Sequence, residues 1–182
     1  ESPATPGNPN PAFSWRFGDA LNTAIPTNLS RINLGSTATF NSRAIAVADL
    51  NGDGRPDVVI GNDQQQSHVL INDGGNPSNW PRVTLGDRFT AFTYSVAVGD
   101  VTGDGRPDVV MGNRYGDQSY VLVNNGSWPD TWARIGLADG LTYPTDMAAI
   151  GDLTGDGRPD VVLGNEYATR YVLVNNGGPP NT

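Results

Sequence analysis

Short apolar runs separated by clusters of turn residues dominate the pattern along this chain. VVIG at 58–61, VAV at 96–98 and VVMG at 109–112 are nearly continuous apolar stretches, and Gly, Pro, Asn and Asp follow or precede each of them. Brief β-branched runs with such punctuation are typical of buried strands joined by tight turns. No amphipathic helix of useful length is visible. The pattern predicts an all-β protein.

The chain also repeats itself. AVADLNGDGRPDVVIGN (46–62) recurs as AVGDVTGDGRPDVVMGN (97–113) and as AIGDLTGDGRPDVVLGN (149–165). The remainder of each unit repeats more loosely, for example HVLINDG (68–74) against YVLVNNG (120–126 and 171–177). A fixed period of about 50 residues is the signature of a repeat architecture.

Each unit is expected to supply four short antiparallel strands. In the second unit these are Ser95–Gly99, Val109–Gly112, Tyr120–Asn124 and Ala133–Leu137. Four strands in about 50 residues match one blade of a β-propeller. We therefore predict three such repeats within residues 29–182, at about 36–86, 87–138 and 139–182.

The phase of the repeats is offset. Residues 29–35 resemble a fourth strand (Arg31–Leu34) without a unit before it, and the last repeat lacks its fourth strand. Residues 1–28 are expected to be a tail and linker, since their first part is polar and Pro-rich. Closed propellers have about four to eight blades. Two copies paired head-to-tail into a six-bladed ring are favoured; a piece of a longer propeller and an open filament remain alternatives.

Each repeat contains a nine-residue loop of the pattern D-x-[N/T]-x-D-G-R-P-D. Side-chain oxygens at positions 1, 3, 5 and 9 and the carbonyl of position 7 are the hard donors that Ca²⁺ prefers, and glycines allow the turn. One Ca²⁺ per repeat is predicted. The predicted ligands are Asp49, Asn51, Asp53, Arg55 and Asp57; Asp100, Thr102, Asp104, Arg106 and Asp108; and Asp152, Thr154, Asp156, Arg158 and Asp160.

Two other interpretations of these loops are weaker. An EF-hand needs a bidentate Glu at position 12, where this chain has Ile60, Met111 and Leu163. Metal-free Asx turns are the second alternative. Three carboxylates in nine residues repel one another unless a cation lies among them, which favours the metal.

The pattern D-x-[N/T]-x-D-G-R-P-D-V-V-x-G-N resembles the FG-GAP/VCBS repeat, the Ca²⁺-binding blade of integrin α-subunit propellers. It is also similar to repeats of secreted propellers of the Psathyrella velutina lectin type. The resemblance covers roughly residues 29–176 and implies a propeller, bound Ca²⁺ and an extracellular, secreted setting. It implies no single function, because such repeats serve adhesion, sugar binding and accessory roles.

Composition narrows the classes of function. The net charge is −8 with 11 basic residues, all Arg, and nine of the 19 acidic residues lie in the three loops. An acidic chain without a basic cluster argues against nucleic acid and anionic membranes. No apolar run is long enough for membrane insertion. With no Cys, no Lys and the single His68, the chain is not expected to be an enzyme.

A ligand surface is expected where the loops after the second strand and before the first strand gather. Aromatic rings beside polar side chains suit a sugar. The candidate contacts are Asn113, Arg114, Tyr115, Asn165, Glu166, Tyr167, Tyr94 and Tyr143, and also the unrepeated Trp128. The favoured function is a lectin-like or adhesion module that binds a glycan or an extracellular protein. The alternative is a self-assembling protein, made rigid by Ca²⁺, that binds no glycan.

Overall fold

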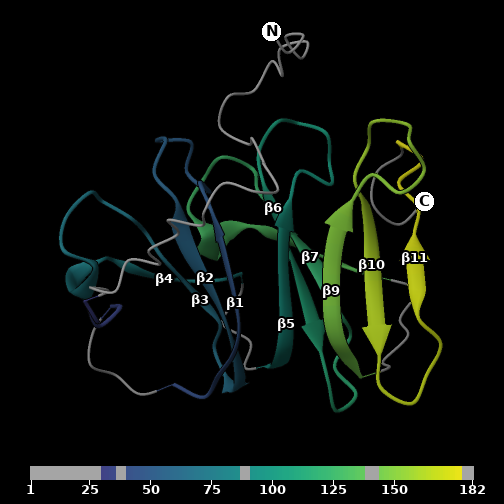
Figure 1. Ribbon diagram of the computed structural model, residues 1–182, viewed down its shortest axis with the longest axis horizontal. Helices are drawn as coiled ribbons and strands as arrows, with labels where there is room; N and C mark the ends of the chain where they lie inside the picture. Colours follow the sequence, from purple (N-terminus) through teal and green to yellow (C-terminus); the bar gives the residue numbers. More distant parts are fainter. Residues whose placement is uncertain (1–29, 36–39, 87–90, 138–143, 178–182) are drawn as a thin grey trace, which may run out of the picture. The chain divides into compact units, whose positions relative to one another are not determined.

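The computed structural model describes residues 30–35, 40–86, 91–137 and 144–177. The chain divides into two compact units, residues 1–31 and 32–182, and every described strand belongs to the second. The described residues form antiparallel sheets and two 3₁₀ turns, without an α-helix (Figure 1). The all-β prediction is confirmed.

The strands follow the three sequence repeats. Repeat 1 contains β1 (Ser42–Ala48), β2 (Asp57–Gln65), β3 (His68–Leu70), η1 (Pro77–Asn79) and β4 (Arg82–Thr84). Repeat 2 contains β5 (Ala91–Gly99), β6 (Asp108–Asn113), β7 (Tyr120–Val123), η2 (Pro129–Thr131) and β8 (Ala133–Gly136). Repeat 3 contains β9 (Thr145–Gly151), β10 (Asp160–Asn165) and β11 (Tyr171–Leu173).

Within each repeat, consecutive strands pair antiparallel. The four predicted strands of repeats 1 and 2 are therefore present, with ends shifted by a few residues. One pairing was not predicted. The long strand β2 continues past its own repeat and pairs with the start of β5, through Asp63 opposite Phe92, so that repeats 1 and 2 share one eight-stranded sheet. Strands β9, β10 and β11 form a separate three-stranded sheet.

The strand predicted at Arg31–Leu34 is wrong, because residues 30–34 have no regular structure. A fourth strand needs the third strand of its own repeat as a hydrogen-bonding neighbour, and no described strand lies beside these residues. Their position is nevertheless that of a fourth strand. The Gly35 N–H donates to the Pro77 carbonyl at 2.9 Å, as the Gly86 N–H after β4 donates to the Pro129 carbonyl at 2.9 Å.

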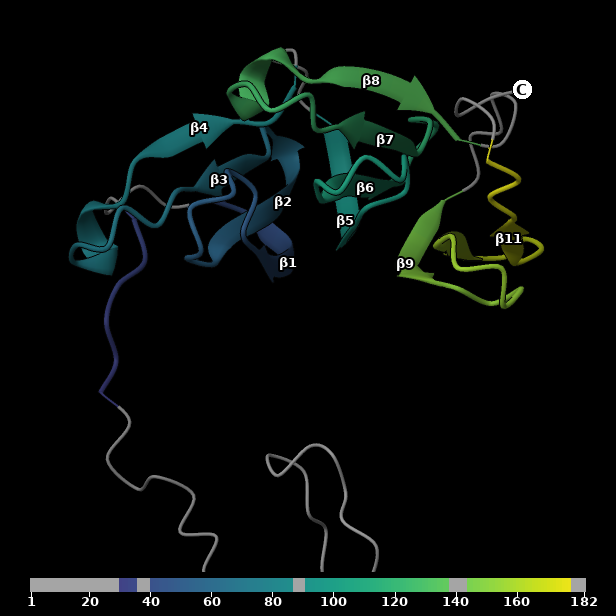
Figure 2. The ribbon, with the colours of Figure 1, turned by 90° about the horizontal axis from the view of Figure 1, so that it is seen from above.

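The sheets of neighbouring repeats stand side by side (Figure 2), and each core cluster combines residues of two adjacent repeats. Val59 and Val69 of repeat 1 pack in one cluster with Met111 and Leu122 of repeat 2. Val110 and Val121 pack in a second cluster, with residues of repeat 3 that include Leu163. A β-sheet exposes two faces, so stacking is what buries the apolar runs seen in the sequence.

An asparagine ties each of these interfaces together, fully buried at Asn124 and half-buried at Asn175. The Asn124 amide donates to the Pro107 carbonyl of its own repeat and to the Leu50 carbonyl of repeat 1, at 3.1 and 2.9 Å. Asn175 repeats this arrangement with the Pro159 and Val101 carbonyls at the same distances. Because the acceptors are backbone carbonyls, the bonds hold one loop against the next independently of the side chains there.

Met111 tests the inter-repeat core, because it is fully buried between repeats 1 and 2. We expect Met111→Ala to lower the free energy of unfolding by about 2–5 kcal/mol, since it leaves a cavity in a packed interface. Met111→Leu keeps the volume and should cost under about 1.5 kcal/mol. Urea denaturation of the two variants measures both values, and equal, small losses would contradict an interface core at this position.

Candidate metal-binding loops and ligand surface

The first Asp of each loop organises the turn that follows it. The Asp49 carboxylate accepts the N–H groups of Gly52, Asp53 and Gly54 at 2.8, 3.1 and 2.7 Å. Both glycines have positive φ, +75° and +83°, which a side chain would oppose. Asp100 and Asp152 hold the second and third loops through the same three bonds, at 2.7–3.0 Å and 2.7–3.2 Å. The backbone is thus wrapped around one carboxylate in every repeat.

The last Asp of each loop is buried and cross-links two strand ends. Asp57 accepts the Leu50 N–H at 3.0 Å with one oxygen and the Asn72 N–H at 2.8 Å with the other. Asp108 and Asp160 make the same pair of contacts in repeats 2 and 3. This structural role was not predicted, although the invariant position of the residue in the three repeats is a signal for it.

Burial sets the electrostatics of these carboxyl groups. Loss of solvation raises the pKa of Asp57 and of Asp108, against the backbone N–H groups that lower it. At Asp160 the balance is reversed, and the Asn175 N–H is the main cause that lowers its pKa.

The Arg at position 7 links its loop to the end of the third strand of the same repeat. The Arg55 guanidinium donates to the Asp53 carboxylate and, at 2.7 Å, to the Asn72 carbonyl. Arg106 and Arg158 pair in the same way with Asp104 and Asp156.

The loops carry the oxygen donors that Ca²⁺ prefers, but their side chains are not gathered around one point. Among the described residues, no three Asp, Glu, His or Cys side chains converge as a metal cluster. The type of donor atom and the net charge of each loop do suit Ca²⁺. Each loop carries three carboxylates and one Arg, a net charge of −2 that one Ca²⁺ balances. A carboxylate has about four lone-pair sites, and the three N–H groups on Asp49 leave it free capacity.

Some candidate ligand residues do come together on the surface where β5 begins. The Arg114 guanidinium lies 4.6 Å from the Tyr94 ring centre and forms an ion pair with Glu166. Tyr115 packs edge-on against Tyr94, with 6.1 Å between ring centres. Tyr167 is almost fully exposed in repeat 3. Tyr143 lies outside the described residues.

Two asparagines of the predicted set have structural roles instead. Asn113 is fully buried, donates to the Gln118 carbonyl at 2.9 Å and accepts from the Thr93 hydroxyl. Asn165 makes the equivalent bonds with the Thr169 carbonyl and the Thr145 hydroxyl. These bonds hold the loop after the second strand, so Asn113 has no surface to offer a ligand.

Three charged residues of this cluster are not among the predicted ligand contacts. Asp63 accepts from Arg43 at 3.0 Å and from the Tyr94 hydroxyl at 3.2 Å, and Asp146 pairs with Arg114. The hydrogen bond to Asp146 is the main cause that raises the pKa of Arg114. The available signal was that equivalent positions differ in charge between repeats. Such differences place opposite charges across the boundary of two repeats.

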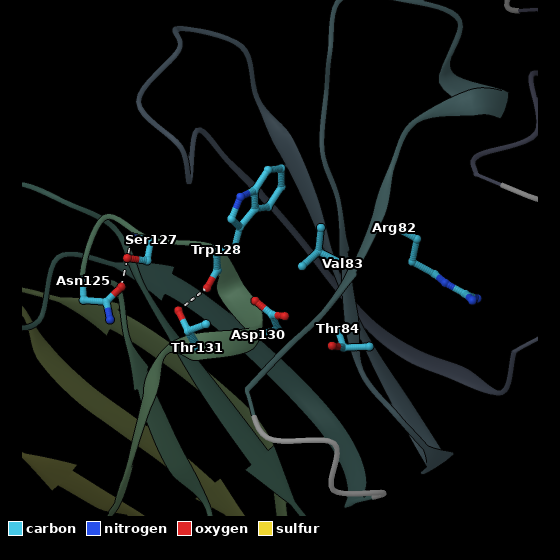
Figure 3. A pocket seen from close by; sticks show the side chains of 8 residues that line it. All are labelled: Arg82, Val83, Thr84, Asn125, Ser127, Trp128, Asp130 and Thr131. Carbon is cyan, nitrogen blue, oxygen red and sulfur yellow. Dashed lines mark hydrogen bonds between the residues drawn. The ribbon is translucent and has the colours of Figure 1, made fainter.

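A groove on the surface lies beside Trp128, between repeats 1 and 2 (Figure 3). This groove of about 800 Å³ has Val83 and Thr84 of β4 on one side, and Trp128, Asn125 and Asp130 on the other. Trp128 is 60% exposed, as expected for the one Trp of the region without a repeat equivalent. The Thr131 hydroxyl donates to the Trp128 carbonyl at 2.8 Å and steadies the turn.

A smaller cavity of about 200 Å³ adjoins the other side of Trp128. It is lined by Leu50 and Asn51 of the first loop and by Trp132. Trp132 is buried in the inter-repeat core, and its ring nitrogen donates to the Ser127 carbonyl at 3.0 Å. Trp128 and Ser127 therefore line both the groove and the cavity beside the first loop.

The family described as "FG-GAP-like repeat" matches residues 49–111 and 100–163, which together cover more than half of the chain. The chain belongs to the FG-GAP-like repeat family. Its repeats are related to the β-propeller blades of integrin α subunits. Human integrin alpha-7 is 37% identical over 103 residues, covering 48% of this chain and 8% of the relative. Human integrin alpha-6 is 31% identical over 137 residues, covering 66% of this chain and 12% of the relative.

Integrin alpha-PS2 of Drosophila melanogaster is 27% identical over 143 residues, covering 68% of this chain and 10% of the relative. The FG-GAP-like chain thus spans only about a tenth of the length of these integrin subunits. In the described part of the chain, no helix is long and apolar enough to cross a membrane.

His68 also has a structural place in the FG-GAP-like repeat. It is buried, its Nδ1 lies 3.2 Å from the Asn62 amide nitrogen, and Phe40 packs 4.9 Å from its ring centre. Burial lowers its pKa, which favours the neutral imidazole. The only histidine of the chain therefore takes part in packing.

The FG-GAP-like loops make a direct test of the buried Asp possible. We expect Asp108→Asn to destabilise the protein by about 1–3 kcal/mol in chelator, because the new amide NH₂ would face backbone N–H donors. Thermal and urea unfolding measure the loss. The exposed Asp73→Asn, outside the loops, is the matched control and should change little. If Asp108→Asn leaves the free energy of unfolding unchanged in chelator, the structural role of Asp108 is contradicted.

Proposed function

We propose that this FG-GAP-like chain is an extracellular, Ca²⁺-stabilised recognition module that binds carbohydrate in the groove beside Trp128. The observation that carries the proposal is the exposed indole in a groove of about 800 Å³ whose other walls are mainly polar. The extracellular setting rests on the resemblance to integrin-type repeats. A large aromatic surface beside fixed polar groups is a common arrangement for sugars.

The chemistry of the groove suits a pyranose ring. The indole of Trp128 offers a flat apolar surface for the C–H face of the sugar. Asn125 and Asp130 offer amide and carboxylate groups for its hydroxyls, and Asp130 is exposed. The Asn125 side chain already accepts the Ser127 N–H at 3.0 Å, which orients its amide before a ligand arrives. Preorganised polar groups cost less entropy on binding.

Calcium enters the proposal as a source of rigidity. The residues that would hold it are the three loop sets predicted above, represented by Asp100, Thr102, Asp104, the Arg106 carbonyl and Asp108 in repeat 2. When bound, the ion would neutralise the −2 charge of each loop. In repeat 1 the loop lies next to the groove's aromatic residue, because Asn51 and Trp128 line the same small cavity. Sugar binding should therefore weaken when Ca²⁺ is removed.

The metal role is tested at the exposed Asp of the second loop. With Ca²⁺ at about 100 times its dissociation constant, Asp104→Ala should lose the roughly 2.7 kcal/mol that one site contributes. In chelator it loses a half-exposed ion pair with Arg106, worth under about 1 kcal/mol, and an exposed hydrogen bond from the Arg106 N–H, so the loss should be smaller than with Ca²⁺. Thermal unfolding with and without Ca²⁺ measures the difference. Asp73→Ala serves as the control, and equal losses in both conditions would exclude the metal.

The sugar role is tested with a glycan array followed by titration of the strongest sugar. Trp128→Ala should weaken binding about tenfold or more, which corresponds to about 1.4 kcal/mol. Tyr167→Ala removes an aromatic ring that is even more exposed but lies in repeat 3, and should leave affinity unchanged. An array without any binding in the presence of Ca²⁺, or equal binding by Trp128→Ala, would contradict the proposal.

A second candidate function is self-assembly, which the sequence left open. A specific observation favours it independently of any sugar. The largest apolar side chains exposed on β1 and β9 lie where further repeats would stack.

A further inference from the structure

The sheets of repeats 1 and 3 each have one face that no described repeat covers. The N-end face consists of Ile45 and Val47 on β1 and Ile60 on β2. The C-end face consists of Met147 on β9, Leu153 in the third loop, and Val172 and Val174 at β11. Ile45, Val47 and all four residues of the C-end face are exposed.

Both faces reproduce surfaces that are buried elsewhere in the same chain. Val172 is 49% exposed, whereas its repeat equivalents Val69 and Val121 are 0% and 2% exposed. Leu153 is exposed, whereas the equivalent Leu50 is buried. These positions in repeats 1 and 2 form the sides that receive the next repeat.

The N-end face is the matching half. Ile45 and Val47 occupy the positions of Val96 and Val98 in repeat 2, which pack against the core shared with repeat 1. In repeat 1 the two side chains are 64% and 61% exposed. The chain thus carries both halves of one interface, one at each end of its row of repeats.

The space beside two equivalent glycines differs between the covered face of repeat 2 and the uncovered face of repeat 3. A Cβ at Gly99 would meet Ile150 of the next repeat at 2.8 Å, so the two strands approach closely there. At the equivalent Gly151, on the C-end face, a Cβ would meet nothing within 4 Å. Since Val47 is the repeat equivalent of Ile150, its side chain is the expected occupant of the space beside Gly151.

A hydrogen bond is also missing at each end. Asn124 and Asn175 both donate to a loop carbonyl of the repeat before them, but the equivalent Asn72 donates only to the Pro56 carbonyl among the described residues. At the other end, the Leu153 carbonyl, equivalent to those of Leu50 and Val101, receives no described amide. The Asn72 amide at the N-end could therefore donate to a Leu153 carbonyl at the C-end of another copy.

The edge of the third sheet gives a third independent indication. Strand β11 is an edge strand, whereas β3 and β7 are covered by β4 and β8. Ile32 and Leu34 hold the place of a fourth strand beside repeat 1, where both are exposed. Their repeat equivalents Val83 and Leu85 are at least half-buried. An uncovered edge and an unpaired apolar segment at opposite ends can satisfy each other.

We propose that the C-end face of one copy of this chain binds the N-end face of a second copy, head-to-tail. In this pairing Asn72 of one copy donates to the Leu153 carbonyl of its partner, and residues 32–34 lie along β11. Two copies contribute six repeats, a number within the range of closed propellers. Mutual pairing at both ends makes the assembly a closed dimer rather than a filament.

Light scattering and sedimentation of the full chain test the pairing. A mass of twice 19.2 kDa that does not grow with concentration is expected. Val47→Asp, on the N-end face, and Met147→Asp, on the C-end face, should each be monomeric. Both interfaces of the closed dimer contain the substituted face of one copy, so a buried charge disrupts both. Mixing the two variants should restore a complex of one copy of each, because the intact C-end face of one meets the intact N-end face of the other.

Controls separate the interface from folding. Tyr115→Asp alters a side chain of equal exposure on the middle repeat and should stay dimeric. Gly151→Leu fills open space in the single chain, so it should keep its circular dichroism spectrum yet weaken the dimer. A monomeric parent chain, unchanged dimers of either Asp variant, a mixture that fails to associate, or a mass that grows without limit would each overturn the closed head-to-tail dimer.

Discussion

Stacking of one sheet on the next is the interaction on which the rest of this structure depends. A four-stranded sheet with apolar residues on both faces cannot bury them by itself. Val59, Val110 and Met111 are fully buried because a neighbouring repeat lies over them. Identical side chains are exposed where no described repeat lies over them, as the change from Val121 to Val172 illustrates. Stability is therefore a property of interfaces, as in other repeat proteins.

The loops and the interfaces are coupled through a few polar residues. Asp57 and its equivalents hold the loop to the end of the third strand, and the Asn at that strand end reaches the preceding loop. The loops and the boundaries between repeats are thus joined by the same short chain of hydrogen bonds. This connection gives a physical reason for placing cation binding, rigidity and the Trp128 groove in one function.

The parts of the repeat that vary are as informative as the parts that do not. Arg43, Tyr94 and Asp146 occupy one repeat position, and Asp63, Arg114 and Glu166 occupy another. Their contacts run across repeat boundaries, from Asp63 to Tyr94 and from Arg114 to Asp146 and Glu166. A repeat array that used identical residues here would place like charges together. Because these positions differ between repeats, each boundary pairs an acidic side chain with a basic or hydroxyl-bearing one.

Sequence alone determined the local structure of this protein. The threefold D-x-[N/T]-x-D-G-R-P-D pattern specified the loop positions, the flanking strands and the family, because turn geometry and β-branched runs act over a few residues. Tertiary structure decided what depends on distant neighbours. Residues 30–34 lack a strand because no third strand lies beside them, and Asn113 is buried by the loop it holds. The pairing of β2 with β5 and the opposite charges across boundaries arise only when whole repeats stack, a condition that no local pattern encodes.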